Sequence, residues 1–308
     1  MRILSLLAQR NRNRYSTLME NSPSVRNALG LGALVVLICL NIFVYFCQSP
    51  AKKDLRVTFL DVGQGDAVLV EAPNGNTLLY DAGPGTVILP KLGEELGFLG
   101  RTIDVAVSSH PDADHIGGFP EVIRRYHIDL MLVSGASSSN PIDEEAERAI
   151  TETGVHRFVA HQGQRINLGG GVVADVLYPA GDTSHMETND ASIVLRIAYG
   201  KTSFLLTGDL PSNFEQVIAG QYGDQASSTV LKLGHHGSRT SSDPLFLRAI
   251  HPEFVVVSAG KENRYGHPHK EVVAEVAQLG IPLYRTDLQG NITFLSDGTQ
   301  VNVETDRE

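Results

Sequence analysis

The chain has 308 residues, of which 42% are hydrophobic and 19% are charged, so it can bury a full globular core and has neither a disordered nor a fibrous composition. Its formal net charge is −10, and residues 51–308 alone carry 34 acidic and 20 basic side chains. This acidity argues against a domain that grips duplex DNA tightly by itself, because such domains present a broad basic surface. Weak or transient contact with nucleic acid stays open.

The amino-terminal region has the pattern of a membrane anchor. Residues 1–27 form a basic tail with five arginines, and the 20 residues 28–47 are apolar except for Asn41. At about 1.5 Å per residue this run can cross a hydrocarbon core of roughly 30 Å, so we expect one transmembrane helix. No small-x-small site closes the run, which favours a retained anchor over a cleaved signal peptide. Because the more basic flank tends to stay cytoplasmic, residues 52–308 are expected outside the cytoplasm.

The rest of the chain alternates apolar strand patterns with amphipathic helices. Strands are predicted over 55–60, 67–71, 76–80, 103–107, 128–133, 171–178, 192–198, 202–206, 229–233 and 254–258. Helices are predicted over 86–98, 119–126, 142–153, 213–221, 244–250 and 270–279. Two sheets packed face to face with helices outside fit this order, so we expect one α/β (α+β) domain over 52–308. Both cysteines lie in the apolar run 28–47, so this domain has no disulfide and no thiolate ligand.

Three of the predicted strands end in potential metal ligands. The 103–107 strand runs into His110, Asp112, Asp114 and His115, and the 202–206 strand runs into Asp209. The 229–233 strand ends in paired histidines at 235 and 236. A solvated acidic loop would explain the first cluster alone, but the repetition at three carboxyl ends, where open α/β sheets place their sites, predicts a metal centre.

The first cluster carries a family resemblance. It reads His110-x-Asp112-x-Asp114-His115, and further along come a strand ending in Gly-Asp and a further histidine. This order resembles the metallo-β-lactamase superfamily, whose signature is H-x-H-x-D-H, with Asp112 at the place of the second histidine. The resemblance implies an αββα sandwich.

Three further motifs narrow the resemblance. FLDVGQGD at 59–66, LGHHGS at 233–238 and NRYGHPH at 263–269 are similar to the soluble metallo-hydrolase domain of the ComEC family of DNA-uptake channel proteins. The similarity runs over about residues 55–294. In that family the domain is attached to a multi-span channel and is thought to degrade one DNA strand during uptake. Since one membrane span is predicted here, the protein would either work beside a separate channel or serve another role, such as scavenging or hydrolysis of a small ester.

The ligand types indicate two divalent ions. His110 and Asp112 would bind one ion, Asp114 and His115 the other, with Asp209 bridging them and one more residue, His235, completing the second set. Asn189, Asp190 or Ser192 occupies the place of a third histidine on the first ion. The shift from nitrogen toward oxygen favours Mn²⁺ over Zn²⁺, although raw affinity still favours zinc. Such a pair would activate a water and stabilise the charge that develops on an attacked phosphoryl or acyl group.

Several other residues are candidates with alternatives left open. His267, in a Gly-His-Pro-His turn, would protonate a leaving oxygen or hold a phosphate, unless it is an exposed turn residue. Asp114 is assigned a catalytic as well as a metal-binding role. The remaining candidates are expected to support the site or contact substrate rather than bind metal: Asp61, Gln64, Asp66, Asp81, Asn189 and His236. For Asp61 and Asp66, the two carboxylates in the 59–66 motif, a direct role at the site is the alternative. By the resemblance, Asp81 props the metal loop.

Three functions follow from these patterns. The first is a membrane-anchored, metal-dependent phosphodiesterase, most plausibly a nuclease acting on DNA outside the cytoplasmic membrane. The second is a hydrolase of small esters, lactones, thioesters or phosphate esters, which the same ion pair could serve. The third is a metal-stabilised binding module without turnover. Fold alone does not decide among them.

Overall fold

The structure is a computed structural model that describes residues 23–47, 54–97 and 100–308. The chain divides into two compact units, 1–51 and 52–308. The first unit contains helix α2 (Pro23–Cys47), and most of the predicted basic tail lies outside the described residues. Over the part of the chain that is described, no helix meets the length and hydropathy needed to cross a membrane. The transmembrane helix over 28–47 and its orientation therefore stay predictions.

The second unit is built on two sheets. The first has eight strands in the spatial order β15-β14-β1-β2-β3-β4-β5-β6, and the second has seven in the order β13-β12-β11-β10-β9-β8-β7. The strands of the first sheet are β1 (Leu55–Phe59), β2 (Val68–Glu71), β3 (Thr77–Tyr80), β4 (Thr102–Ser108), β5 (His127–Val133), β6 (His156–Val159), β14 (Ile292–Ser296) and β15 (Val301–Thr305). Those of the second are β7 (Arg165–Gly169), β8 (Val172–Tyr178), β9 (Val194–Tyr199), β10 (Thr202–Leu206), β11 (Val230–Lys232), β12 (Phe254–Val257) and β13 (Leu283–Arg285).

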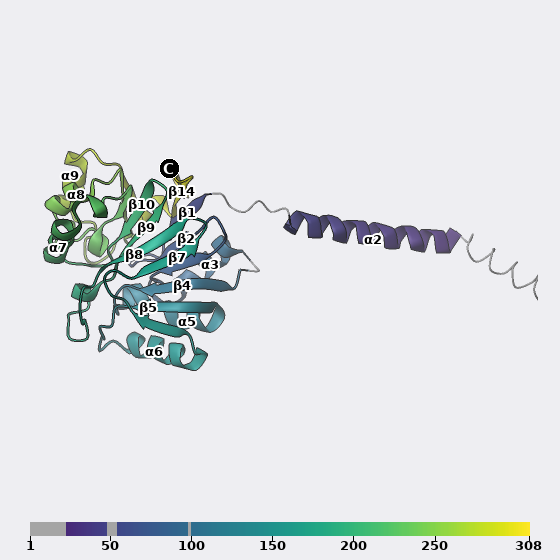
Figure 1. Cartoon of the computed structure of the whole chain (residues 1–308), viewed down its shortest axis with the longest axis horizontal. Coiled ribbons are helices and arrows are strands. Elements are labelled where there is room, and N and C mark those ends of the chain that lie inside the picture. Colours follow the sequence, from purple (N-terminus) through teal and green to yellow (C-terminus); the bar gives the residue numbers. More distant parts are fainter. Residues whose placement is uncertain (1–22, 48–53, 98–99) are drawn as a thin grey trace, which may run out of the picture. The chain divides into compact units, whose positions relative to one another are not determined.

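Helices cover the outer face of each sheet (Figure 1). The helices of the second unit are α3 (Ile88–Leu96), α4 (Ala113–Ile116), α5 (Phe119–Arg125), α6 (Pro141–Thr153), α7 (Ser212–Tyr222), α8 (Pro244–Ile250), α9 (Lys270–Gln278) and α10 (Thr286–Gln289). Apolar side chains of α3, α5 and α6 pack on the eight-stranded sheet, and those of α7, α8 and α9 pack on the seven-stranded sheet. This is the mixed α/β sandwich that the motif order implied.

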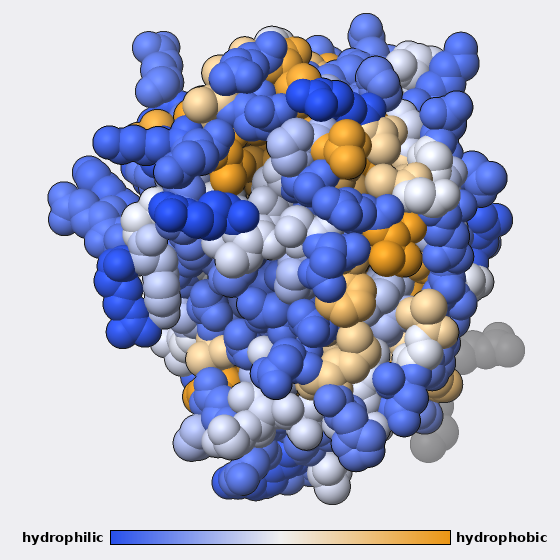
Figure 2. All heavy atoms as spheres, turned by 90° about the vertical axis from the view of Figure 1, so that its left-hand side faces the viewer, coloured by the Kyte–Doolittle hydropathy of each residue, from blue (hydrophilic) through white to orange (hydrophobic). Residues whose placement is uncertain are grey.

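The main core lies between the two sheets and follows from strand periodicity. Val172, Ala174 and Val176 of β8 alternate with less buried residues and point into this core, where they meet side chains such as Phe204 and Phe294. Burial of such apolar area contributes roughly 25 cal/mol per Å² to folding. Seen from the left of Figure 1, the surface is mainly hydrophilic, with apolar atoms in small separate groups (Figure 2).

Helix boundaries also follow from local sequence. Asn140 caps α6 by accepting a hydrogen bond from Ile142 N at 3.0 Å, and Gly154 ends this helix in the left-handed conformation at φ 73°. Asp243 caps α8 in the same way. All predicted strands and helices of this domain are present within a few residues of their expected limits. The pattern missed β6, β7, β13, β14 and β15.

The strand order brings the ligand-bearing loops together. β4 belongs to the first sheet and ends next to His110, while β10 and β11 are parallel neighbours in the second sheet and end next to Asp209 and His235. The chain from 110 to 115 is partly helical, because α4 begins at Ala113, so that Asp114 and His115 project from a helical turn.

Candidate metal centre

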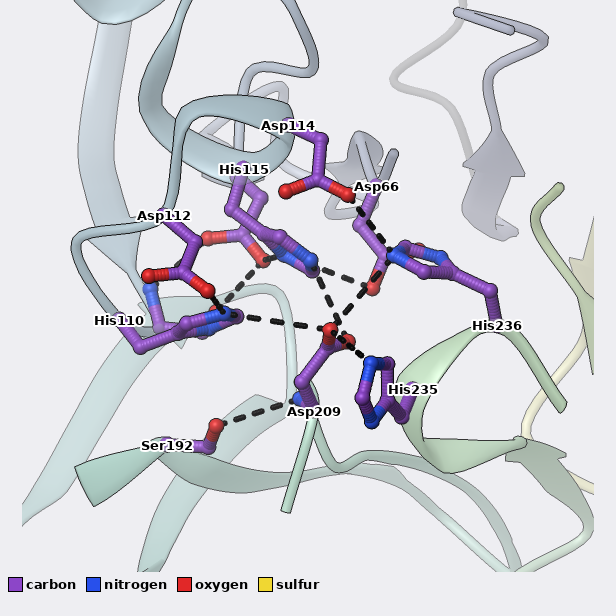
Figure 3. A network of polar contacts seen from close by, with 12 residues as sticks. Asp66, His110, Asp112, Asp114, His115, Ser192, Asp209, His235 and His236 are labelled. Carbon is purple, nitrogen blue, oxygen red and sulfur yellow. Dashed lines mark hydrogen bonds and ion pairs between the residues drawn. The ribbon is translucent and has the colours of Figure 1, made fainter. Parts of the chain in front are cut away.

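Side chains from both sheets converge on the carboxylate of Asp209 (Figure 3). Its Oδ1 atom lies 3.2 Å from Nε2 of His115, and its Oδ2 atom lies 3.6 Å from Nε2 of His236. Nε2 of His110 is 4.0 Å from Oδ2 of Asp209. All four side chains are buried. The sequence-predicted residues His110, His115 and Asp209 therefore share one site, and His236 joins them.

A relay behind two of the imidazoles fixes which nitrogen faces the centre. Nδ1 of His115 donates to Oδ2 of Asp81 at 2.8 Å. The hydroxyl of Ser109 donates to the same Asp81 oxygen at 2.7 Å, so it accepts from Nδ1 of His110 at 2.9 Å. Each ring therefore has its Nδ1 proton bonded to the protein and its Nε2 atom directed at Asp209, so that loss of the Nε2 proton would free a lone pair for a metal ion. Asp81 lies at the back of the site, as the resemblance implied.

His236 has the same orientation from the opposite side. Its Nδ1 atom donates to the backbone carbonyl of Ser258 at 3.0 Å, so its Nε2 atom also points to the centre. The Nε2 atoms of His110, His115 and His236 and Oδ1 of Asp209 are all buried and make no hydrogen bond. Buried polar atoms are rarely left unpaired.

These unpaired atoms fit a bound cation. Three of these residues, His115, Asp209 and His236, can each offer one ligand atom within 4.8 Å of the others, and Asp66 can add a fourth. Imidazole nitrogens and carboxylate oxygens on one buried point are the donor set of a divalent transition metal. The residues present therefore fit the metal that the fold implies.

The electrostatics of the site agree with this fit. Burial lowers the pKa of His236, but the charges of Asp209 and Asp66 outweigh it and raise that pKa to about 9. Burial raises the pKa of Asp209, while the charges of His115 and His236 bring it well below its usual range. Without metal the carboxylates are thus balanced by protonated imidazoles. A dication that takes their place would release those protons.

A buried lysine that the sequence analysis missed lies behind the centre. Lys232, on β11, is fully buried, contacts the carboxylate of Asp66, and donates from Nζ to the carbonyl of Gly208 at 3.2 Å. Burial raises the pKa of Asp66, but the ammonium group of Lys232 and the nearby imidazoles lower it to about 2. A charged residue inside an apolar strand was the available signal, because an ammonium group is buried only when it is paired.

Asp66 faces the rear of two imidazoles. Its Oδ2 atom lies 3.7 Å from Nδ1 of His115, and its Oδ1 atom lies 3.4 Å from Nδ1 of His236. Since metal binding uses the Nε2 atoms of these rings, the position of Asp66 favours the supporting role over a direct one.

The other side of the centre is open. Asp112 and Asp114 keep 36% and 34% of their side-chain surface exposed, and His235 keeps 27%. Asp112 lies 3.7 Å from Nε2 of His110, and Asp114 lies 3.3 Å from Nε2 of His236. His235 Nε2 is 3.7 Å from Asp209. The residues predicted as ligands therefore divide between a buried half and an exposed half.

His235 and His236 share an unusual backbone conformation, but their side chains have different surroundings. Both adopt the left-handed region, at φ 50° and 53°, within a short turn after β11. Asp81 does so too, at φ 59°. Such strain in non-glycine residues concentrates at functional sites. His236 is turned into the core, whereas His235 bonds through Nδ1 to Oγ1 of Thr240 at 3.0 Å.

The remaining candidates lie at the periphery. Asp61 accepts a bond from Arg307 at 2.9 Å, and Oε1 of Gln64 accepts from the backbone of Gly260 at 3.2 Å. Oδ1 of Asn189 is buried and without a partner. The ring of His267 lies 5.5 Å from that of His235, and burial together with the neighbouring imidazoles lowers its pKa to about 4.

Comparison with known proteins identifies the family. Residues 60–261 match the family described as the metallo-beta-lactamase superfamily. The chain belongs to this superfamily. The solved metallo-beta-lactamase fold protein YhfI from Bacillus subtilis covers 79% of this chain and all of its own length, with a TM-score of 0.52 and 12% identity. That likeness concerns the fold alone.

Curated relatives of this metallo-β-lactamase-superfamily chain carry competence names. Competence protein ComA of Neisseria gonorrhoeae is 36% identical over 267 residues, which cover 86% of this chain and 36% of that protein. ComE operon protein 3 of Bacillus subtilis (strain 168) is 30% identical over 291 residues, covering 88% and 36%. The chain thus spans about a third of the length of these relatives. The resemblance to the ComEC family is confirmed.

Proposed function

We propose that the protein is a metal-dependent phosphodiesterase that cleaves DNA. The observation that carries this proposal is the convergence of three unpaired, buried Nε2 atoms on the Asp209 carboxylate. The exposed carboxylates beside them leave an accessible face on which an ester can meet the metal. The competence names of the relatives favour DNA over a small ester as substrate.

We propose two divalent ions, with Mn²⁺ favoured over Zn²⁺. His110 and Asp112 would hold one ion, and His115 and Asp114 the other, with the Asp209 carboxylate between them. Carboxylates are three of these five donors, which suits a harder ion. When bound, the metal supplies Lewis-acid catalysis and lowers the pKa of water.

Two further histidines would complete the site. His236 would share the second ion, because its Nε2 atom lies close to both Asp114 and Asp209. His235 remains a candidate for the same ion from the exposed side. With a pKa of about 4, His267 is neutral near pH 7 and would hold a phosphoryl oxygen through its ring N–H rather than deliver a proton.

The proposal for the cellular setting is based on the relatives and on the apolar run 28–47. The competence relatives are consistent with a membrane-associated role. We propose that the apolar run 28–47 anchors the chain with the hydrolase domain outside the cytoplasm, beside a separate DNA channel. Protection of the domain from protease added to intact spheroplasts would contradict this placement.

Cleavage assays on the full-length protein test the activity. The protein is stripped with chelator and incubated with single- and double-stranded DNA in Mn²⁺, Mg²⁺ or Zn²⁺. We expect cleavage in Mn²⁺ that is lost in Asp114→Ala and kept in Asp129→Ala, an exposed aspartate on β5.

Other outcomes separate the alternatives. Restoration by Zn²⁺ alone would overturn the manganese proposal. Hydrolysis of small esters or lactones without DNA cleavage would favour the second hypothesis. Bound metal without turnover on any ester would favour the binding module.

A further inference from the structure

An exposed aromatic ring stands at the open side of the metal centre. Among the tyrosine and phenylalanine side chains whose burial is described, only Phe158 and Tyr265 are exposed, Tyr265 at 49%. Tyr265 belongs to the loop over 260–269 that carries His267. A single exposed ring needs no explanation by itself, so a binding role for Tyr265 depends on the groups that it contacts.

Ring contacts link Tyr265 to the centre. Its ring lies 5.6 Å from that of His267, with only 21° between the two planes. His267 in turn lies 5.5 Å from the ring of His235 and 6.1 Å from that of His236. Tyr265 is therefore two ring contacts from His235 and His236, so a strand bound at the centre can extend to it.

A guanidinium group completes this surface. Arg264 lies 4.9 Å from the centre of the Tyr265 ring, and its Nη2 atom donates to the tyrosine hydroxyl at 2.6 Å. The hydrogen bond to Tyr265 raises the pKa of Arg264. The charge of Asp114 raises it further, so Arg264 lies within electrostatic range of the centre. The guanidinium group of Arg264 is thus a local positive charge at the exposed side of the centre, in a domain with an excess of acidic residues.

The loop that carries the pair is held in place. Asn263 accepts from the backbone of His267 at 2.9 Å and donates to its carbonyl at 2.6 Å and to that of Gly260 at 2.8 Å. Gly260 donates to Gln64 in the loop after β1. The ring is thus presented by a braced turn, so little order has to be gained when a ligand binds.

We propose that Tyr265 and Arg264 form a nucleobase subsite in which an unpaired base next to the scissile phosphate stacks on this pair. The inference rests on the proposed phosphodiesterase function and names a determinant of its specificity. Stacking on aromatic rings and guanidinium planes is sequence-tolerant, because every base has a π-face. Bases inside a duplex are covered by their neighbours, so Tyr265 would make the enzyme prefer unpaired strands.

The test measures binding in chelator, so that no cleavage occurs. Full-length protein is titrated into a fluorescein-labelled single strand, into the same strand with abasic sites, and into a duplex, with anisotropy as the readout. We expect Tyr265→Ala to weaken binding of the base-containing strand roughly 5- to 150-fold and to leave abasic and duplex binding unchanged. Tyr265→Phe keeps the ring and should stay within about threefold of wild type. Phe158→Ala on the edge strand β6 is the matched control.

Three binding results would overturn the subsite. They are an unchanged affinity in Tyr265→Ala, an equal loss of affinity on the abasic strand, and the absence of any strand binding by the wild type. Cleavage in Mn²⁺ is then compared on single strands and duplexes. A wild type that cleaves both equally, with Tyr265→Ala unchanged, refutes the subsite and leaves the phosphodiesterase. A wild type that binds bases through Tyr265 but cleaves nothing refutes the phosphodiesterase and leaves the subsite.

Discussion

The two halves of the metal centre are held by different means. In the buried half, His110, His115 and His236 each have Nδ1 bonded to the protein, and their Nε2 atoms point to Asp209. In the exposed half, Asp112 and Asp114 are partly exposed and belong to one loop and helical turn. The fold therefore fixes the metal-facing nitrogens before any ligand arrives, while the groups that would meet substrate keep freedom to adjust.

The largest effect should be on stability and should come from the ion pair of Lys232 and Asp66, which lies behind the buried half of the centre. Lys232→Met leaves the buried carboxylate of Asp66 without its ammonium partner, so we expect a loss of roughly 3–5 kcal/mol of unfolding free energy. Urea denaturation of the full-length protein measures it. The double variant Lys232→Met/Asp66→Asn should recover most of the loss, because it removes both charges. A single variant as stable as wild type would show that the pair is not a structural element of the centre.

The second prediction concerns the carboxylate of Asp209 at the centre of the site. Asp209→Asn keeps the shape but removes the charge shared by three imidazoles, so we expect a loss of roughly 100- to 1000-fold in DNA cleavage and a fall in bound metal. Mass spectrometry of the native protein and a cleavage assay give the two values. Cleavage retained with full metal occupancy would remove Asp209 from the site.

A third prediction concerns the loop that carries His235, the partly exposed histidine of the centre. Glu215 is buried in α7 and accepts from the backbone of Ser242 and Asp243, close to the Thr240 that holds His235. Burial raises the pKa of Glu215 to about 7, so the folded protein keeps a proton that the unfolded chain has lost above its usual pKa. The stability that this proton gives is full below about pH 4.5 and is lost as pH rises through 7.

The change is on the order of 3 kcal/mol for this buried group. Glu215→Gln should therefore destabilise the protein less at pH 8 than at pH 5, and its unfolding free energy should vary less with pH. Denaturation at both values measures this, with the exposed Glu144→Gln as control. An unchanged pH dependence in Glu215→Gln would show that the carboxyl group titrates normally.

The smallest predicted effect is the difference in metal affinity between the His235→Ala and His236→Ala variants. His236→Ala should weaken metal binding roughly 10- to 100-fold, because it removes a buried, oriented nitrogen. His235→Ala should cost less than about tenfold, since that ring is partly exposed. Equal losses in the two variants would mean that the exposed histidine binds metal as strongly as the buried one.

Much of this site could be predicted because apolar strands end where the ligands begin. β4, β10 and β11 are short apolar runs followed directly by His or Asp, which is a local pattern. The part that escaped prediction is not local. Lys232 and Asp66 pair across the two sheets, and the choice between His235 and His236 depends on a left-handed turn that no residue preference reveals. β6 was missed because its residues are mostly exposed, and β15 because its half-buried residues alternate with exposed ones and form no apolar run.

The most direct test of this account is a calorimetric titration of the chelator-treated, full-length protein with Mn²⁺ and with Zn²⁺ at pH 6 and pH 8. We expect saturable binding that is tighter at pH 8, because the proton on His236, with a pKa of about 9, must leave as the ion binds. His236→Ala should bind more weakly and release fewer protons. Absence of binding by the wild type, or an affinity that does not change between the two pH values, would contradict the central claim that these unpaired imidazoles form a metal site.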